Sequence, residues 1–197
     1  GQFYDVLTDP QDASIIYGGT QDQGFQRTLA GDSPEASSFE QVISGDYGEM
    51  QFTHSGETIW IQYPGAWFQI YPDAATDGYY SYEFDVEGSD MPNVNWIVPT
   101  GAAPNATDDF IYVGGGNLTG GSGSRLIKLT FTGTSITSSQ YDFDFNSASG
   151  ASISAIETTS FNEELIYVVT ENGRFFYSED EGDSFTMTED YICLLYT

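Results

Sequence analysis

Residues 16–28 read IYGGTQDQGFQRT, and residues 166–178, near the other end of the chain, read IYVVTENGRFFYS. Each stretch is an apolar strand, a polar turn containing glycine, and a second strand, which is the pattern of a β-hairpin. Looser versions of this hairpin occur at 59–70 and at 111–129. The four hairpins recur at a spacing of roughly 45 to 55 residues, so the sequence contains an internal repeat.

The strands around each hairpin complete the repeat. Short apolar runs, broken nearly everywhere by Gly, Pro, Asn or Asp, place one strand before each hairpin and one after it, among them 95–98 and 140–145. No stretch has the period of a convincing helix. Four strands per repeat make a propeller blade, so the predicted fold is all-β, a β-propeller of four-stranded antiparallel blades.

The predicted blades cover residues 1–47, 48–92, 93–149 and 150–190. Residues 191–197 are largely apolar again and are expected to start a further blade. About four blades are therefore visible. The chain opens on Gly1 without an initiator methionine, and we expect it to be part of a larger ring within a longer protein.

The net charge, the cysteine count and the length of the apolar runs limit the functions and locations that the chain can have. The 197 residues include 30 Asp and Glu against 4 Lys and Arg, for a net charge of −26. A nucleic-acid partner is not expected, because binding depends on cations that displace counterions from phosphate. A single cysteine excludes an internal disulfide, and no apolar run reaches the roughly 18 residues of a membrane span. Excess like charge prevents association in salty surroundings, so the expected location is extracellular or on the cell surface.

The strongest local motif is SEDEGDSF at 178–185. It fits the pattern Ser-x-Asp-x-Gly-x-Ser/Thr-Trp/Phe and resembles the Asp-box, or bacterial neuraminidase repeat. In that family the motif is the turn between the third and fourth strands of a blade, and its role is architectural. The aspartate can accept from turn N–H groups, the glycine can supply a positive φ, and the aromatic residue can pack under the turn. The residues concerned are Ser178, Asp180, Gly182, Ser184 and Phe185.

The first blade extends the resemblance. Residues 7–24, LTDPQDASIIYGGTQDQG, and residues 44–52, SGDYGEMQF, look like phrases that recur in sortilin-like and xyloglucanase-like propellers. The resemblance covers the four blades as a pattern, and blades one and four in motifs. It implies the propeller fold, and it brings in glycoside hydrolysis as an alternative function.

Hydrolysis of a glycoside needs two carboxylates that face each other across a cleft. In xyloglucanase-like propellers the acids lie in Thr-Asp-x-Gly and Gly-Asp-x-x-Gly contexts, which Asp22 and Asp46 match in part. The architectural alternative makes Asp22 a turn residue that caps the N–H of Gly24, and Asp46 a turn residue before Gly48. Sialidase chemistry is excluded, because it needs an arginine cluster and the three arginines lie in three different blades.

Aromatic side chains crowd the hairpin of the second blade, at Trp60, Tyr63, Trp67 and Tyr71. Such rings stack on sugars, and Trp67 and Tyr71 are the candidate ligand-binding residues, with Trp67, after the Pro-Gly turn, expected to be the most exposed. The alternative is that these rings form core between blades.

Metal and cofactor sites are not expected. Acidic residues alternate at 142–146 and at 179–183, but neither segment has the glycine and glutamate positions of an EF-hand loop, so an adventitious Ca²⁺ is the most that they suggest. His54 has no second histidine or cysteine near it, and Cys193 lies in an apolar stretch that favours an inert thiol.

These observations favour a non-enzymatic, extracellular interaction or scaffold module, a segment of a larger secreted or surface protein that binds a protein or a polysaccharide. The alternatives are part of a xyloglucanase-like glycoside hydrolase, and acidic repeats of a surface adhesin. The oligomeric state and the ligand stay open.

Overall fold

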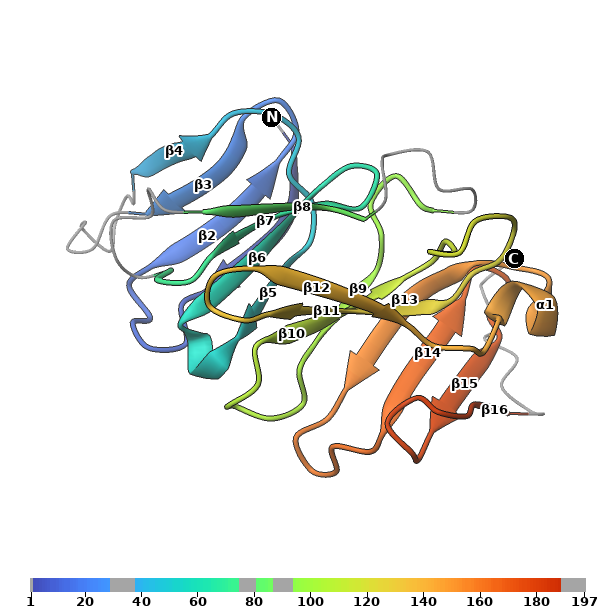
Figure 1. Ribbon diagram of the computed structural model, residues 1–197. Helices are drawn as coiled ribbons and strands as arrows, with labels where there is room; N and C mark the ends of the chain where they lie inside the picture. Colours follow the sequence, from blue (N-terminus) through green and yellow to red (C-terminus); the bar gives the residue numbers. More distant parts are fainter. Residues whose placement is uncertain (1, 29–37, 75–80, 87–93, 189–197) are drawn as a thin grey trace.

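The computed structural model describes residues 2–28, 38–74, 81–86 and 94–188. Four antiparallel sheets of four strands each follow one another along the chain, and each sheet keeps its strands in sequence order. We call these sheets blades 1 to 4 (Figure 1). Blade 1 contains β1 (Phe3–Thr8), β2 (Ile16–Thr20), β3 (Gly24–Thr28) and β4 (Phe39–Ile43), and blade 2 contains β5 (Met50–Thr53), β6 (Thr58–Tyr63), β7 (Trp67–Tyr71) and β8 (Tyr82–Asp85). Blade 3 contains β9 (Thr100–Ala102), β10 (Phe110–Gly114), β11 (Leu126–Phe131) and β12 (Ile136–Gln140), and blade 4 contains β13 (Ile153–Thr158), β14 (Ile166–Thr170), β15 (Phe175–Ser178) and β16 (Thr186–Met187).

The first strands of the blades contact one another in chain order, β1 with β5, β5 with β9, and β9 with β13. Blades 1 and 4 lie at the two ends of the row, with blades 2 and 3 between them (Figure 1). This is the arrangement of blades around a propeller axis, so the all-β propeller predicted from the repeat is confirmed.

The hydrophobic core is divided into three clusters, one between each pair of neighbouring blades. Side chains alternate between the two faces of a strand, so a central blade must be apolar on both faces. In blade 2, for example, Ile59 and Ile61 pack toward blade 1, while Trp60 packs toward blade 3. The apolar core of the fold therefore lies between the blades.

Carboxylates at the inner strands join one blade to the next. The Asp5 carboxylate accepts from the backbone N–H of Met50 at 2.9 Å. Glu49 accepts from the N–H of Thr100 at 2.8 Å and from its hydroxyl at 2.9 Å. Burial raises the pKa of the Glu49 carboxyl, although the bonds from Thr100 act in the opposite direction.

Two predicted strands are wrong. Residues 95–98 form a loop, and the first strand of blade 3 is β9, a few residues later. Of the predicted strand at 140–145, Gln140 is the last residue of β12, and the residues after it lead into a short helix, α1 (Phe145–Ser149). Asp144 begins this helix by accepting from the N–H groups of Asn146 and Ser147, and Gly150 ends it at a φ of +80°. A helix of one turn is too short to leave a period in the sequence.

The predicted start of a further blade at 191–197 lies outside the described residues. In the part of the chain that is described, no helix has both the length and the apolar character that crossing a membrane requires.

Candidate functional site

The two candidate carboxylates lie together at one end of the propeller. Asp22 lies in the β2–β3 turn at a φ of +62°, and its N–H donates to Asp46 Oδ1 at 2.9 Å. Asp46 belongs to the connection between blades 1 and 2, which the topology brings to the same end as that turn. The capping contact therefore runs from the Asp22 backbone to Asp46, not from the Asp22 side chain to Gly24.

Aromatic side chains lie at the same end of the propeller as these carboxylates. Trp96, in the connection between blades 2 and 3, is 54% exposed, and its ring lies edge-on to that of Tyr4 in β1 at a centroid distance of 5.5 Å. Partial desolvation, with the nearby charges of Asp46 and Asp22, raises the pKa of the Tyr4 phenol. The two carboxylates thus act on the Tyr4 phenol in the same direction.

The hairpin tip of blade 2 completes this end. The N–H of Gly65 donates to the carbonyl of Trp96 at 3.1 Å, which holds the β6–β7 turn against the Trp96 segment. Tyr63 is exposed, and its ring lies perpendicular to that of Trp67 at 5.6 Å. The aromatic–acidic surface, as we name it, consists of Tyr4, Asp22, Asp46, Tyr63, Trp67 and Trp96.

The candidate ligand-binding aromatics are placed differently from one another. Trp67 is half-buried at the edge of the aromatic–acidic surface. Tyr71 is only 5% exposed, packs against Phe25 across the interface of blades 1 and 2, and donates its hydroxyl to Gln69. Tyr71 is thus a core residue whose ring has no open face for a sugar.

Sequence reasoning missed Trp96. The residue lay inside the predicted strand at 95–98, where a tryptophan is easily taken for core. The neighbouring Asn95 and Pro99 are loop residues, and their presence on both sides was the available signal.

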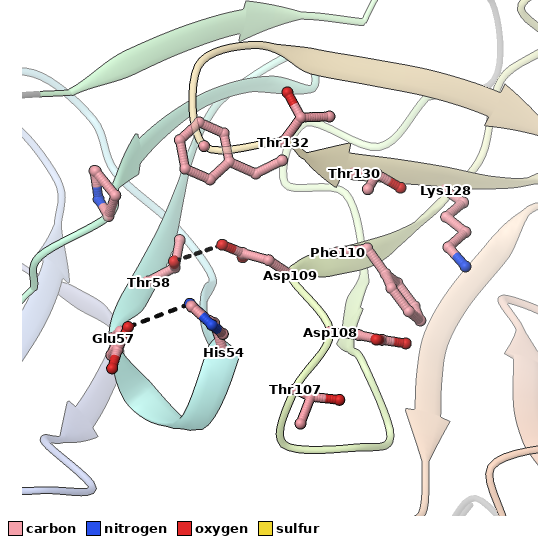
Figure 2. Close-up of a pocket in the computed structure, with 13 residues that line it drawn as sticks. His54, Glu57, Thr58, Thr107, Asp108, Asp109, Phe110, Lys128, Thr130 and Thr132 are labelled. Atoms are coloured by element: carbon pink, nitrogen blue, oxygen red, sulfur yellow. Dashed lines mark hydrogen bonds and ion pairs between the residues drawn. The ribbon is translucent and has the colours of Figure 1, made fainter.

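A separate pocket of about 680 Å³ opens between blades 2 and 3 at the opposite end (Figure 2). Figure 2 shows His54 and Glu57 on one wall, and Asp108, Phe110 and Lys128 on the other. Asp109 points between the walls toward Thr58, and its carboxylate accepts from the hydroxyls of Thr53 and Thr58.

The charged groups of this pocket already have partners. His54 Nδ1 lies 3.3 Å from Glu57 Oε2, and Asp108 accepts from the Asn105 amide at 2.9 Å. The Lys128 ammonium lies 3.6 Å above the Phe110 ring, a cation–π contact. These groups can hydrogen-bond a small polar ligand, but they do not form a nucleophile–base pair.

The turn at 178–185 joins β15 to β16. Its Asp180 accepts from the N–H of Ser184 at 2.9 Å and from the Ser184 hydroxyl at 2.6 Å. Gly182, at a φ of +94°, donates its N–H to Ser178 Oγ at 2.8 Å. Phe185 packs under the turn on Phe145 at a ring distance of 4.8 Å. The side chains of Ser178, Asp180 and Ser184 all hydrogen-bond within the turn.

This turn predicts a pH effect. Hydrogen bonds from Ser184 and Ser178 lower the pKa of Asp180, so its carboxylate stabilises the fold above the ordinary value of 3.8. That stability is lost as the pH falls below 3.8 through the lower folded pKa. In Asp180→Asn we expect lower stability at pH 7 and a smaller loss on acidification than in the wild type, measured by urea unfolding at about pH 7, 4 and 3. Parallel curves for the two proteins would contradict this assignment.

Of the alternating acids at 142–146, Asp144 caps α1 and lies 4.0 Å from Arg125. Within the described ranges, no group of three His, Cys, Asp or Glu side chains is placed to hold a metal ion.

No protein-family model matches the sequence, and no curated protein matches it. Solved structures do match. The crystal structure of the RRP9 WD40 repeats aligns with a TM-score of 0.60 at 10% identity, over 94% of this chain and 50% of that chain. The structure of U3-55K aligns with a TM-score of 0.60 at 10% identity, over 94% and 51%. The β-propeller domain of Cps50 (Swd1) from Myceliophteria thermophila aligns with a TM-score of 0.57 at 10% identity, over 95% and 53%.

The chain thus has the β-propeller fold, and it spans about half the length of the solved structures that it matches. The resemblance to Asp-box propellers is supported as to fold and not as to family, because the matched propellers include WD40 repeats. At 10% identity the likeness concerns the fold alone, and function must be argued from the surface.

Proposed function

We propose that this propeller is a non-enzymatic interaction module that binds a partner protein through the aromatic–acidic surface. The observation that carries the proposal is Trp96, which is 54% exposed and held edge-on to Tyr4. Tryptophan and tyrosine dominate the binding energy of protein interfaces, and a ring held in place by its neighbours loses little entropy on binding.

The charges around these rings favour a basic partner. Asp46, which accepts from the Asp22 N–H, follows Gly45, where a Cβ would lie 3.1 Å from the Tyr63 ring, and the chain as a whole carries a net charge of −26. A guanidinium or ammonium group over an aromatic face, with a carboxylate next to it, gains both a cation–π contact and an ion pair. The field of the whole chain would also accelerate encounter with a positively charged surface.

The location of the protein and its ancestry are further parts of the proposal, and they rest on composition and on the turn at 178–185. We propose an extracellular or cell-surface location, supported by the acidic composition, and a segment of a larger secreted or adhesive protein. We also propose an Asp-box ancestry, on the ground of the hydrogen bonds that Asp180 and Gly182 make in the turn.

A peptide of alternating arginine and glycine is a direct probe. We expect it to bind the wild type with an affinity that falls steeply as salt is raised, because exposed charges are screened. Trp96→Ala and Asp46→Asn are expected to weaken binding by about tenfold or more. Phe161→Ala is the matched control, since Phe161 is 99% exposed in the β13–β14 loop at the opposite end of the blades. Titration calorimetry measures all four proteins.

Three results would overturn the proposal. Equal binding by Trp96→Ala and Phe161→Ala would leave only a nonspecific charge effect. Retention of a neutral β-glucan oligosaccharide, independent of salt and lost in Trp67→Ala, would point to a polysaccharide partner instead. The release of reducing ends from that oligosaccharide, abolished in Asp22→Asn, would establish a glycoside hydrolase.

A further inference from the structure

The outer face of blade 1, the one turned away from blade 2, is apolar and open. Phe3, Val6 and Phe39 are 48%, 54% and 42% exposed. Val6 pairs with Gly18, and a Cβ built at Gly18 would lie 2.4 Å from the Phe3 ring, so these residues share one face. The rings of Phe3 and Phe39 lie 6.0 Å apart. Exposed large apolar side chains gathered in this way mark an interaction surface.

The internal repeat allows this face to be compared with the corresponding face of blade 4. The β1–β2 ladder of blade 1 and the β13–β14 ladder of blade 4 have the same register, including the same irregularity after the first pair. Phe3 therefore corresponds to Ile153, and Val6 to Ile156. In blade 4 these positions are 0% and 6% exposed.

Blade 3 covers those positions in blade 4. Ile153 and Ile156 pack in one cluster with Phe110, Tyr112 and Leu126 of the preceding blade. The same face, with apolar residues at the same positions, is thus buried by the preceding blade in blade 4 and open in blade 1. This difference depends on what lies beside the blade, not on its sequence pattern.

We propose that the outer face of blade 1, made of Phe3, Val6 and Phe39, is an interface between blades, and that its occupant is a further four-stranded blade of the same polypeptide, supplied by sequence outside these 197 residues. Such a blade would present aromatic and aliphatic side chains, as Phe110, Tyr112 and Leu126 do toward blade 4. The inference is independent of the proposed partner, because this face lies between blades and not at their ends.

Length and charge favour a blade of the same polypeptide over a second copy. The solved propellers match 94–95% of this chain but only about half of their own length, so the matched chains continue beyond the aligned blades. A second copy would bring another net charge of −26 against the first, and this repulsion opposes association.

Thiol labelling tests the proposal directly. Val6→Cys is made in a Cys193→Ser background, both in the 197-residue chain and in the natural polypeptide that contains it. We expect a maleimide to label Cys at position 6 readily in the isolated chain and about 100-fold more slowly in the natural polypeptide, because a docked blade must open first. Ser138→Cys, on the exposed edge strand β12, is expected to label quickly in both, and Ile156→Cys slowly in both.

Val6→Thr gives a second measurement that keeps the shape of the side chain. We expect it to lower the melting temperature of the natural polypeptide by about 2–4 °C and to leave the isolated chain nearly unchanged. Rapid labelling of position 6 in the natural polypeptide would overturn the proposal, as would a natural polypeptide of 21.6 kDa that is monomeric. If the isolated chain is a dimer in which Cys at position 6 labels slowly, the face binds a second copy of the chain. That result would overturn the proposal that a further blade of the same polypeptide covers it.

Discussion

Gly24→Ala is expected to destabilise the protein by more than about 3 kcal/mol, a large part of the stability of a domain of this size. Gly24 starts β3 at a φ of +74°, where a Cβ is strained by itself. That Cβ would also lie 1.7 Å from the carbonyl oxygen of Ile43 at the end of β4. Since backbone cannot yield as a flexible side chain does, β4 would have to separate from β3. Urea unfolding, followed by tryptophan fluorescence and circular dichroism, measures the loss.

Gly173→Ala separates strain from the clash. Gly173 has a similar φ of +78° in the corresponding turn of blade 4, but no neighbouring atom lies within 4 Å of the position that an alanine methyl group would take. We therefore expect Gly173→Ala to cost about 1–2 kcal/mol, from backbone strain alone. Equal losses of stability in Gly24→Ala and Gly173→Ala would show that the clash of the alanine methyl group with the Ile43 carbonyl costs no stability.

Asp109→Ala is expected to cost about 3 kcal/mol, because it removes the acceptor that joins blade 2 to blade 3. Asp109 accepts from the hydroxyl of Thr53 at 2.5 Å and from that of Thr58 at 2.7 Å. The Thr53 hydroxyl in turn accepts from the indole N–H of the buried Trp60 at 2.8 Å. Loss of the carboxylate would leave two buried hydroxyls without their acceptor. Chemical denaturation with the same two probes measures the change.

Two neighbours provide the controls. Asp108→Ala alters an exposed carboxylate in the same loop and is expected to change stability by no more than about 0.5 kcal/mol. Asp109→Asn keeps one acceptor oxygen and is expected to fall between the wild type and Asp109→Ala. If Asp109→Ala were as stable as Asp108→Ala, the network would not contribute to holding blades 2 and 3 together.

The repeat was readable from the sequence because a hairpin is a local structure. The two strands of 16–28, like those of 166–178, are joined by a turn of a few residues. The apolar strand residues and the turn glycine therefore lie close together in the sequence, where a local pattern shows them. The same local reasoning failed at 95–98 and 140–145. There the chain passes between blades, and whether an apolar residue is strand or loop depends on the blade beside it.

The aromatic–acidic surface could be predicted only in pieces. Asp22, Asp46 and Trp67 were each visible as turn or hairpin residues, but their common location follows from how blades 1 and 2 are set around the axis. The contact of Tyr4 with Trp96 joins β1 of blade 1 to the connection between blades 2 and 3, and no local sequence pattern predicts it. Tyr71, read from the same hairpin as a ligand-binding candidate, is instead buried by blade 1.

The sequence by itself determined the class of fold, the four repeats, the acidic charge and the turn at 178–185. The charge follows from composition, and the other three depend on interactions between residues close together in the sequence. The tertiary structure alone decided which aromatic rings are core and which are surface, and which carboxylates join blades. Burial depends on the blade packed against a face, and apolar residues at the same register position therefore end in opposite environments, as Val6 and Ile156 show.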